Sequence, residues 1–502
     1  MNTIEKINRD WDFVIGIEVH VQLETKSKMF STCEYTFDQS PNTLTCPTSI
    51  GLPGALPSIN EKAIDFAIQF GGAVNATVHP SFSFARKHYF YPDLPKGYQI
   101  SQFEEPLCLN GNVKFNISKK AVNVALERIH LEEDTARLIH DADIIKGQQV
   151  SLMDVNRSGV PLMEVVSKPD IHSADEAIGY LKKLRQTLRY LEISDADMEK
   201  GSFRCDANIS VKPKGEKELG SKVEVKNMNS FRSIHKAIET EIIRQSNLLA
   251  KGETVAQETR GFIDAQGITV SQRSKEQAHD YRYFPEPDLP PLIFKKSHID
   301  TIHESLIELP NEKSLRFQEQ YKLAPEEAEF LSSSKIKAQN YEETVKIISK
   351  NRPEKKNDAT LEKIIANWYM GDIAKHLNQI SLDAELQDTK VDTEQIASLI
   401  LLLADKTITS AVAKTVLDKM FENGQDPQKI VENEGLGQMN NDDEVNEIIE
   451  EIIENNEKAI ADFKSGKETA LGFLIGQAMK ATRGRIDANN AKEIIIKKLN
   501  KD

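Results

Sequence analysis

The sequence predicts an α+β fold, in which a mixed domain of strands and helices is followed by an all-helical half. Residues 1–297 contain short runs in which apolar and polar residues alternate, with helical apolar spacing between them. Beyond about residue 298 the alternation stops and only helical periodicity remains. A chain of 502 residues is long enough for roughly three domains of about 150 residues each, so we expect more than one core.

The composition is that of an ordinary globular protein. Hydrophobic residues make up 39% of the chain and charged residues 28%, which argues against a disordered protein. No apolar run reaches about 18 residues, so we expect no membrane-spanning segment and no membrane partner. The first residues lack the basic patch and apolar core of a secretion signal, which predicts a cytoplasmic protein. The net charge of −14 disfavours a general polyanion binder, although a local basic strip can still bind RNA.

The elements of the mixed domain follow from local patterns. Residues 13–23 alternate as a strand does, with an apolar face and a second face that carries Glu18, His20 and Gln22. The segment Ser173-Ala-Asp-Glu176 is a capping box that begins a helix. The other predictions are helices over residues 61–70 and 230–249, strands at 207–211 and 223–225, loops at 41–57 and 85–99, and a closing proline-rich segment at 284–292.

A run of acids inside an apolar, strand-like setting is the strongest sign of chemistry. Residues 128–138 read Arg-Ile-His-Leu-Glu-Glu-Asp-Thr-Ala-Arg-Leu, and buried carboxylates need a proton, a basic partner or a metal. In a regular strand His130, Glu132 and Asp134 share one side and Glu133 lies on the other, so spacing alone favours Glu132. Oxygen-rich ligation with at most one imidazole suits magnesium better than zinc, and magnesium usually accompanies nucleotide phosphates.

Glu18 and His20 lie two residues apart on the first predicted strand and point the same way, a pair that a metal or a phosphate can use. On its own this spacing is common, and the polar face of an edge strand explains it more simply. The acid-rich segment in the same domain changes that judgement, because one shared inward face then accounts for both sets of residues.

Two segments, residues 86–96 and 280–288, mix bases with aromatic residues that can contact phosphates and stack on a nucleobase. Composition alone equally allows a surface loop. The sequence contains neither a P-loop nor a Rossmann glycine motif, so nucleotide binding requires another architecture. The candidate contacts are Arg86, Lys87, Tyr91, Lys96 and Arg282.

The four cysteines are far apart, and Cys33, Cys46, Cys108 and Cys205 form no CxxC pair. This spacing argues against a zinc ribbon and a disulfide framework, and it predicts reduced thiols. We expect Cys205 to be a small buried side chain, whereas the neighbouring Asp206 is the better candidate for chemistry.

The helical half is predicted to divide at residues 387–393, where Asp392-Thr-Glu gives a helix start signal. This places a helical domain at 298–391 and a tail domain at 392–502. Amphipathic helices are predicted over residues 361–377, 393–403 and 444–460. Near its end the tail carries a basic tip, Lys480, Arg483 and Arg485, which either grips an RNA backbone or complements a helix dipole.

Several of these segments resemble one family, the GatB/GatE proteins of the tRNA-dependent amidotransferases. The resemblance keeps its order from residue 13 to about 490. The segments that carry it are Gly16-Ile-Glu-Val-His-Val-Gln-Leu23, Tyr89-Phe-Tyr-Pro-Asp93, His130-Leu-Glu-Glu-Asp134, Asp154-Val-Asn-Arg-Ser-Gly-Val-Pro-Leu-Met-Glu-Val-Val166, Arg204-Cys-Asp-Ala-Asn-Ile-Ser210, Asn227-Met-Asn-Ser-Phe231 and Asp280-Tyr-Arg-Tyr-Phe-Pro-Glu-Pro-Asp288.

The resemblance implies a cradle-like α+β domain, a helical domain and an all-α tail of the YqeY type. It also implies that the protein uses ATP and Mg²⁺ to phosphorylate the side-chain carboxylate of mischarged Glu-tRNA(Gln) or Asp-tRNA(Asn). Ammonia, released from glutamine by the amidotransferase's glutaminase component GatA, then displaces the phosphate to give Gln-tRNA(Gln) or Asn-tRNA(Asn). The expected assembly is a heterotrimer with GatA and GatC.

Carried over residue by residue, the resemblance implies catalytic roles for Glu133, Glu164 and Asp206. It disagrees with strand parity about Glu132 and Glu133, and we follow the resemblance because a β-bulge would overturn parity. The implied magnesium ligands are Glu18, His20, Glu133 and Glu164.

The family's tail recognises the outer elbow of tRNA, which favours the RNA-binding interpretation of Lys480, Arg483 and Arg485. Some members carry a cysteine-based zinc site, which we expect to be absent here. Two alternatives to an activating enzyme component stay open. The chain could be a non-catalytic tRNA-binding and assembly scaffold with salt-bridged acids, or an amide synthetase for small molecules that works alone. The second alternative leaves the long helical tail unexplained.

Overall fold

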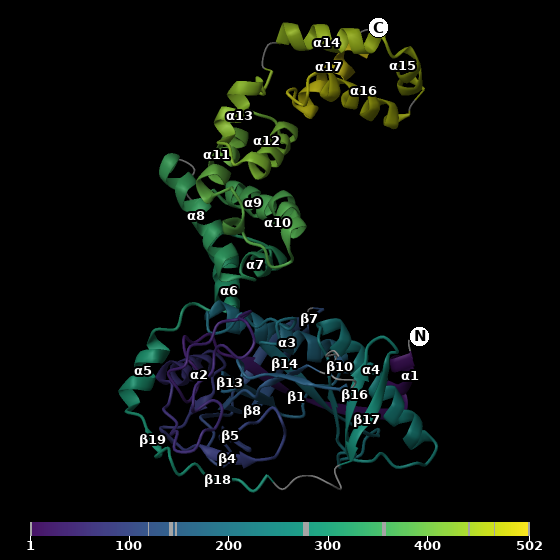
Figure 1. Cartoon of the computed structure of the whole chain (residues 1–502). Helices are drawn as coiled ribbons and strands as arrows, with labels where there is room; N and C mark the ends of the chain where they lie inside the picture. Colours follow the sequence, from purple (N-terminus) through teal and green to yellow (C-terminus); the bar gives the residue numbers. More distant parts are fainter. Residues whose placement is uncertain are drawn as a thin grey trace. The chain divides into compact units, whose positions relative to one another are not determined.

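The computed structural model describes residues 3–118, 120–139, 144–145, 148–274, 281–353, 358–439, 442–465 and 467–499. The chain divides into two compact units, Met1–Leu309 and Pro310–Asp502 (Figure 1). The first unit mixes strands and helices, and beyond Ile293 the described residues form helices and connections alone. The predicted α+β class is thereby confirmed. In the described part of the chain, no helix is both long enough and apolar enough to cross a membrane.

A ten-stranded sheet forms the centre of the first unit, with the order β17-β16-β15-β14-β1-β13-β8-β6-β2 and with β7 paired to β8 beside this path. Neighbouring strands are antiparallel, except for the parallel pair β15 and β16. The strands are β1 (Trp11–Gln22), β2 (Thr77–Val78), β6 (Cys108–Leu109), β7 (Asn112–Ile117), β8 (Lys120–Glu133), β13 (Pro161–Ser167), β14 (Phe203–Pro213), β15 (Val223–Lys226), β16 (Glu258–Ile263) and β17 (Ile268–Ser274).

Three helices, α2 (Glu61–Ala73), α3 (Ala174–Tyr190) and α4 (Phe231–Ala250), pack against this sheet and bury its apolar side chains (Figure 1). On β1 the odd-numbered residues from 15 to 21 are fully buried in that core, as the alternation predicts. The other face of β1 therefore carries its polar residues.

Side-chain caps fix where these three helices begin. The side chains of Asn60, Ser173 and Ser230 accept hydrogen bonds from backbone N–H groups in the first turns of α2, α3 and α4. A cap of this kind stabilises a helix by about 1 kcal/mol. The three predicted helices are confirmed, with ends within a few residues of those expected.

Residues 85–99, predicted as a loop, are partly strand. β4 (Ala85–His88) pairs with β5 (Tyr98–Ser101) and with β18 (Phe284–Pro285). β4 reads Ala-Arg-Lys-His, without apolar alternation, so its partners rather than its own pattern make it a strand. The other elements of the unit are β3 (Ser81–Phe82) with β19 (Leu292–Ile293), β9 (Arg137–Ile139) with β12 (Leu152–Asp154), β10 (Ile144–Ile145) with β11 (Gln148–Gln149), α1 (Thr3–Asp10) and α5 (Lys296–Glu304).

The second unit has two apolar cores. The larger core includes Leu386, Val391 and Ile396, so residues on both sides of the predicted 391/392 limit pack together. The predicted limits at 297/298 and 391/392 stay predictions. The helices are α6 (Pro310–Gln320), α7 (Pro325–Leu331), α8 (Lys335–Asn351), α9 (Ala359–Trp368), α10 (Ala374–Ile380), α11 (Thr393–Ala404), α12 (Ser410–Asn423), α13 (Pro427–Glu434), α14 (Asp442–Glu454), α15 (Glu457–Lys464), α16 (Glu468–Ala481) and α17 (Ala488–Leu499).

Two of the predicted helices in this half are interrupted. Between α9 and α10 the chain forms a π turn, Tyr369–Ile373, a local widening that often marks functional positions. The predicted helix over 444–460 breaks after Glu454. The side-chain amides of Asn455 and Asn456 donate to the carbonyls of Glu451 and Ile452 at 2.9 and 2.8 Å, which satisfies the last turn of α14.

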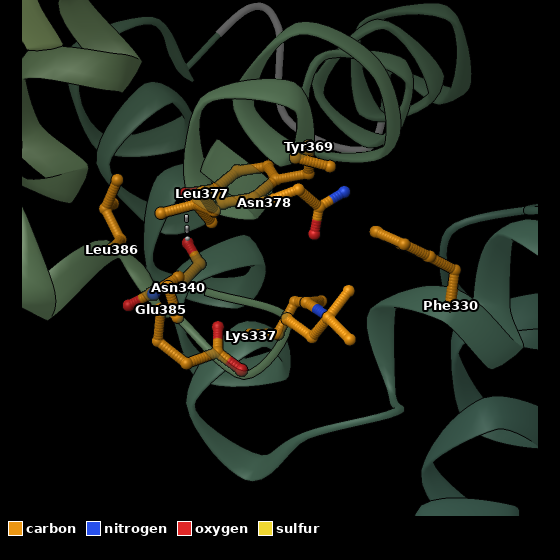
Figure 2. Close-up of a pocket in the computed structure, with 11 residues that line it drawn as sticks. Phe330, Lys337, Asn340, Tyr369, Leu377, Asn378, Glu385 and Leu386 are labelled. Atoms are coloured by element: carbon orange, nitrogen blue, oxygen red, sulfur yellow. Dashed lines mark hydrogen bonds between the residues drawn. The ribbon is translucent and has the colours of Figure 1, made fainter. Parts of the chain in front are cut away.

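A cavity of about 150 Å³ lies beside the π turn (Figure 2). The hydroxyl of Tyr369 donates to the backbone carbonyl of Asn340 at 3.2 Å, and the ammonium of Lys337 lies 4.5 Å from the ring centre of Phe330. The predicted site residues do not line this cavity, so it has no part in the candidate site.

Candidate functional site

The polar face of the sheet carries a row of side chains from four neighbouring strands. His20 of β1 lies opposite Arg204 of β14 and opposite Glu164 of β13, and Glu164 lies opposite His130 of β8. Cross-strand partners point to the same face, so this row lies on the side away from the helices. Glu132, two residues beyond His130 on β8, shares that face. Four segments that are far apart in sequence thus meet at one place.

Three of these side chains form a candidate metal site. The Nε2 atom of His20 lies 3.4 Å from Oε2 of Glu164 and 3.8 Å from Oε1 of Glu132. One ligand atom from each residue lies within 4.8 Å of the others, which makes this the one such group of three or more among the described residues. The two glutamates are only 3% and 7% exposed. A buried group of two carboxylates and an imidazole can hold a cation.

Burial and mutual charge shift the pKa values at this site. Burial opposes a charge on His20, but its hydrogen bond to Glu164 and the charges of Glu164 and Glu132 raise its pKa to about 9. Burial also opposes the charge of Glu164, yet His130 and His20 hold its pKa well below the usual range. For Glu18, burial and then the charges of Glu164 and Glu224 raise the pKa. The site therefore concentrates negative charge, which a bound cation would relieve.

The structure separates the two adjacent glutamates of β8. Glu133 accepts a hydrogen bond from the ammonium of Lys96 and another, at 2.9 Å, from the backbone N–H of Ile100. Pairing with β13 is regular through Glu132 and Glu133, and its one shift falls at the far end, between Val166 and Ser167. Strand parity therefore holds, and the geometry brings Glu132 rather than Glu133 to His20. A metal role for Glu133 gains no support from this arrangement.

Glu18 and Asp206 form a neighbouring cluster on the same face. They lie opposite each other on β1 and β14, and Asn208 donates to Glu18 at 2.8 Å. The ammonium of Lys226 contacts Asp206 at 2.8 Å and Glu224 at 3.2 Å. Both predicted acids are thus beside the three-residue group, and Asp206 already has a basic partner.

Among the predicted nucleotide contacts, Lys87 of β4 has a charge that acts on the metal group. Burial opposes its charge, but Glu132, Tyr283 and Glu164 outweigh burial and raise its pKa. Lys96 is bound to Glu133. Arg86 donates to Glu286 at 2.7 Å and to Asp288 at 3.1 Å. These carboxylates anchor Arg86 in the three-stranded sheet.

The other two predicted nucleotide contacts lie in loops around that sheet. Tyr91 is 58% exposed. Arg282 has a left-handed backbone, and its carbonyl accepts a hydrogen bond from the ring of His88. Neither geometry identifies a nucleotide pocket, so both roles stay predictions.

Sequence reasoning missed two arginines at this face. Arg128 of β8 approaches Glu164, with Nη2 3.7 Å from Oε1. Arg204 donates to Asp134 at 3.0 Å, and Asp134 also contacts Arg157. Burial opposes the charge of Asp134, but these last two arginines lower its pKa. Parity from His130 would have placed Arg128 on this face, whereas the partners of Arg204 depend on a register that local patterns do not give.

The basic tip of the tail lies at the end of α16. Lys480 and Arg483 are exposed, and Arg483 has a left-handed backbone. Arg485 is half-buried and donates to the carbonyl of Gly435 at 3.4 Å. Two of the three predicted RNA contacts are therefore accessible, and the third also ties the tip to the end of α13.

Comparisons with known proteins cover almost the whole chain. A family model described as the GatB/GatE catalytic domain matches residues 13–300, and one described as the GatB domain matches residues 354–499. A relative from Carboxydothermus hydrogenoformans is 44% identical over 493 residues, 98% of this chain and 100% of its own. Relatives from Persephonella marina and Clostridium beijerinckii are also 44% identical, over 97% and 98% of this chain and 99% of their own. Each of the three is named as the B component of an aspartyl/glutamyl-tRNA(Asn/Gln) amidotransferase.

Proposed function

The chain belongs to the GatB/GatE family, and from that premise we propose that it activates a tRNA-linked carboxylate with ATP. The substrate is Glu-tRNA(Gln), Asp-tRNA(Asn) or both. Amidation with ammonia from GatA then gives Gln-tRNA(Gln) or Asn-tRNA(Asn). The protein is a ligase component of an amidotransferase and works in protein biosynthesis.

Phosphorylation answers a specific chemical difficulty. Ammonia cannot displace an oxygen from a free carboxylate, because oxide is too poor a leaving group. When a carboxylate oxygen attacks the γ-phosphorus of ATP, ADP leaves and an acyl phosphate forms. Ammonia then attacks the carbonyl carbon and inorganic phosphate leaves. Loss of one proton from nitrogen completes the amide.

The observation that carries the proposal is the group of His20, Glu132 and Glu164. Carboxylate oxygens with one imidazole fit Mg²⁺, and the surplus of negative charge at this face favours a cation. We assign the metal ligands to these three residues, with Glu18 as a neighbouring carboxylate, and we place Glu132 where the family resemblance implied Glu133. Bound Mg²⁺ would neutralise charge on the phosphoryl group during transfer.

The chain's own residues prepare this place for an anionic substrate. Ser101 holds Glu132 through a contact of 3.3 Å between its Oγ and Oε2, which fixes the carboxylate. Lys87 keeps its positive charge beside Glu132 and Glu164, and an ammonium there can pair with a phosphate oxygen. Asp206 lies beside the metal group and is bound to Lys226. A role in catalysis would require this ion pair to open.

The remaining parts of the proposal concern partners and place. Lys480, Arg483 and Arg485 would contact the backbone of the tRNA, since two of them are exposed at the end of α16. GatA and GatC would complete the heterotrimer, and the cytoplasm, where translation takes place, is its expected location.

The test is tRNA-dependent ATP cleavage by the complex of this chain with GatA and GatC. Glu132→Gln and Glu164→Gln keep the side-chain shape and remove the charge, so each should lower cleavage by about 100-fold or more. Asp264→Asn is the matched control, because Asp264 lies in the exposed turn between β16 and β17, and it should retain full activity.

Glutamine hydrolysis by GatA serves as the internal check on assembly. If Glu132→Gln and Glu164→Gln both cleave ATP as the natural chain does, the two carboxylates are structural and the chain is a tRNA-binding scaffold. If cleavage proceeds without tRNA and without the two partner proteins, the chain is a free-standing synthetase.

A further inference from the structure

Two cysteines that are 13 positions apart meet in the loop between β1 and α2. Cys46 lies close enough to Cys33 to act on its charge, and the thiol of Cys33 donates to the carbonyl of Glu34 at 3.6 Å. The Sγ atom of Cys46 also lies 3.4 Å from Oγ of Ser31 and 3.5 Å from Oγ of Ser49, and it accepts a hydrogen bond from the backbone N–H of Ser49 at 3.4 Å. Two hydroxyl groups and one backbone N–H therefore surround this sulfur.

A buried lysine adds positive charge to the pair. Lys28 is 1% exposed, and its ammonium donates to the carbonyl of Leu44 at 2.8 Å. Burial lowers the pKa of Lys28, and electrostatic attraction to Cys33 and Cys46 opposes that shift. A cation and hydrogen-bond donors at a sulfur are the conditions that stabilise a thiolate.

The two thiols differ in how easily they ionise. Burial opposes a charge on Cys46, but the hydroxyls of Ser31 and Ser49 and nearby backbone N–H groups lower its pKa to about 7. Burial raises the pKa of Cys33. Both side chains are only partly buried, so small molecules can reach the thiolate of Cys46.

Hydrogen bonds hold the backbone on both sides of this pair. The carbonyl of Cys33 accepts from the N–H of Lys28 at 2.9 Å. The carbonyl of Ser49 accepts from the hydroxyl of Ser158 at 3.0 Å, and the N–H of Leu44 donates to Asn156 at 2.7 Å. The loop is thus anchored to the segment that leads into β13, and the two thiols are held together in the folded chain.

We propose that Cys46 and Cys33 form a redox-active dithiol, in which Cys46 is the nucleophile, Cys33 the resolving thiol and a low-molecular-weight disulfide the oxidant. A low-pKa, accessible thiolate beside a second thiol is the arrangement that reacts in this way. Nothing in the proposed amidation uses either residue, so this dithiol is an activity separate from the candidate site.

The reaction proceeds in two exchanges. The Cys46 thiolate attacks one sulfur of the oxidant RSSR, forms a mixed disulfide and releases RS⁻, which takes a proton. The Cys33 thiol then loses its proton, attacks the sulfur of Cys46 and releases a second RS⁻, which is also protonated. Two protein thiols are oxidised to one disulfide while RSSR is reduced to two RSH.

The test is exposure of the reduced full-length chain to oxidised glutathione at neutral pH, followed by peptide mass analysis without reductant. We expect a crosslink between the peptides of Cys33 and Cys46 with the loss of two hydrogens. Cys33→Ser should instead retain one glutathione on Cys46, whereas Cys46→Ser should give neither product. Cys108 and Cys205 are internal controls, because both are buried, and burial raises the pKa of Cys108 to about 12.

The alkylation rate of Cys46 gives a second measurement that needs no variant. Its thiolate forms as pH rises, so the rate of reaction with iodoacetamide should rise with a midpoint near pH 7, about two units below that of an ordinary thiol. Separate glutathione adducts on Cys33 and Cys46 without a crosslink would overturn the resolving role. Modification that occurs only after unfolding would overturn the proposal as a whole.

Discussion

Two clusters of buried charge lie in the first unit, and they balance that charge in different ways. The candidate site contains His20, Glu132 and Glu164 on the polar face of the central strands. The second cluster, the α4 ion network, joins Glu241 and Arg244 of α4 to Glu258 and Arg260 of β16. Both are built from carboxylates and bases at low exposure, yet of the two only the first contains histidines, which can lose their charge.

The α4 ion network contains two acids and two arginines, and its central carboxylate is fully satisfied. Glu241 is 0% exposed. It accepts from Arg244 at 2.6 Å, from Gln245 at 2.9 Å and from Thr269 at 2.8 Å. Each charge in this network has an opposite partner, so the network needs no ligand to balance its charge, and removal of one partner is costly.

In the candidate site the carboxylates have imidazoles as partners, in addition to Arg128, whose Nη2 lies 3.7 Å from Oε1 of Glu164. Glu164 lies between His20 and His130, at 3.4 Å from each ring. Glu132 is bound by one hydroxyl at 3.3 Å and lies 3.8 Å from His20. Histidine can lose its proton whereas arginine cannot, so this cluster can change its charge when a cation binds. Partners that can lose their charge therefore favour a role in ligand binding, and partners that keep their charge favour a structural role.

The largest expected effect is on the α4 ion network. Glu241→Ala leaves two half-buried guanidinium groups that cannot lose their charge and that share Glu258 as an acidic partner, so we expect the free energy of unfolding to fall by about 3 kcal/mol. Urea denaturation of the full chain measures this loss. Asp264→Ala removes an exposed carboxylate that pairs with Lys236 at 3.5 Å, and it should change stability by about 1 kcal/mol at most. If the two variants lose equal free energies of unfolding, the α4 ion network contributes no more to stability than an exposed ion pair does.

The second effect concerns a cation at the candidate site. Mg²⁺ at about ten times its dissociation constant should raise the free energy of unfolding by about 1.4 kcal/mol, because it binds the folded chain alone. Glu132→Gln should abolish this gain, and Glu133→Gln should retain it, since Glu133 faces Lys96. Thermal unfolding with and without Mg²⁺ measures the difference. The opposite pattern would show that the family resemblance, and not strand parity, identifies the ligand.

These two regions also show what the sequence could and could not predict. The alternation of β1, the cap at Ser173, and the shared side of His130 and Glu132 are local properties, and the structure has all of them. Local periodicity also predicted that Glu132 rather than Glu133 faces the metal site. The family resemblance implied Glu133, which would require a β-bulge near these residues, but the irregularity in this pairing lies between Val166 and Ser167.

Strand order and register across the sheet could not be predicted in this way. Glu164 reaches His20 only because β13 inserts between β1 and β8. The pairing of Glu133 with Lys96 and the pairing of β4 with β18 likewise depend on partners far along the chain. Such partners are selected by the whole core, so periodicity within one segment gives no access to them.

The smallest expected effect is a pH dependence that Glu164 imposes on His20. The pKa of His20 is raised from 6.5 in the unfolded chain to about 9 in the folded one. Its contribution to stability is therefore fully present below pH 6.5 and is lost as pH rises through 9. Glu164→Gln removes the partner that contributes most to this shift. His20 and His130 can then become neutral, whereas the arginines around Glu241 cannot. With chelator present, we expect the variant to gain stability relative to the natural chain between pH 6.5 and 9, by about 1.4 kcal/mol for each pKa unit of the His20 shift that depends on Glu164. If the free energies of unfolding of the variant and the natural chain change in parallel over that pH range, His20 titrates independently of Glu164. The candidate site would then be a structural ion network, like the α4 ion network, rather than a cation site.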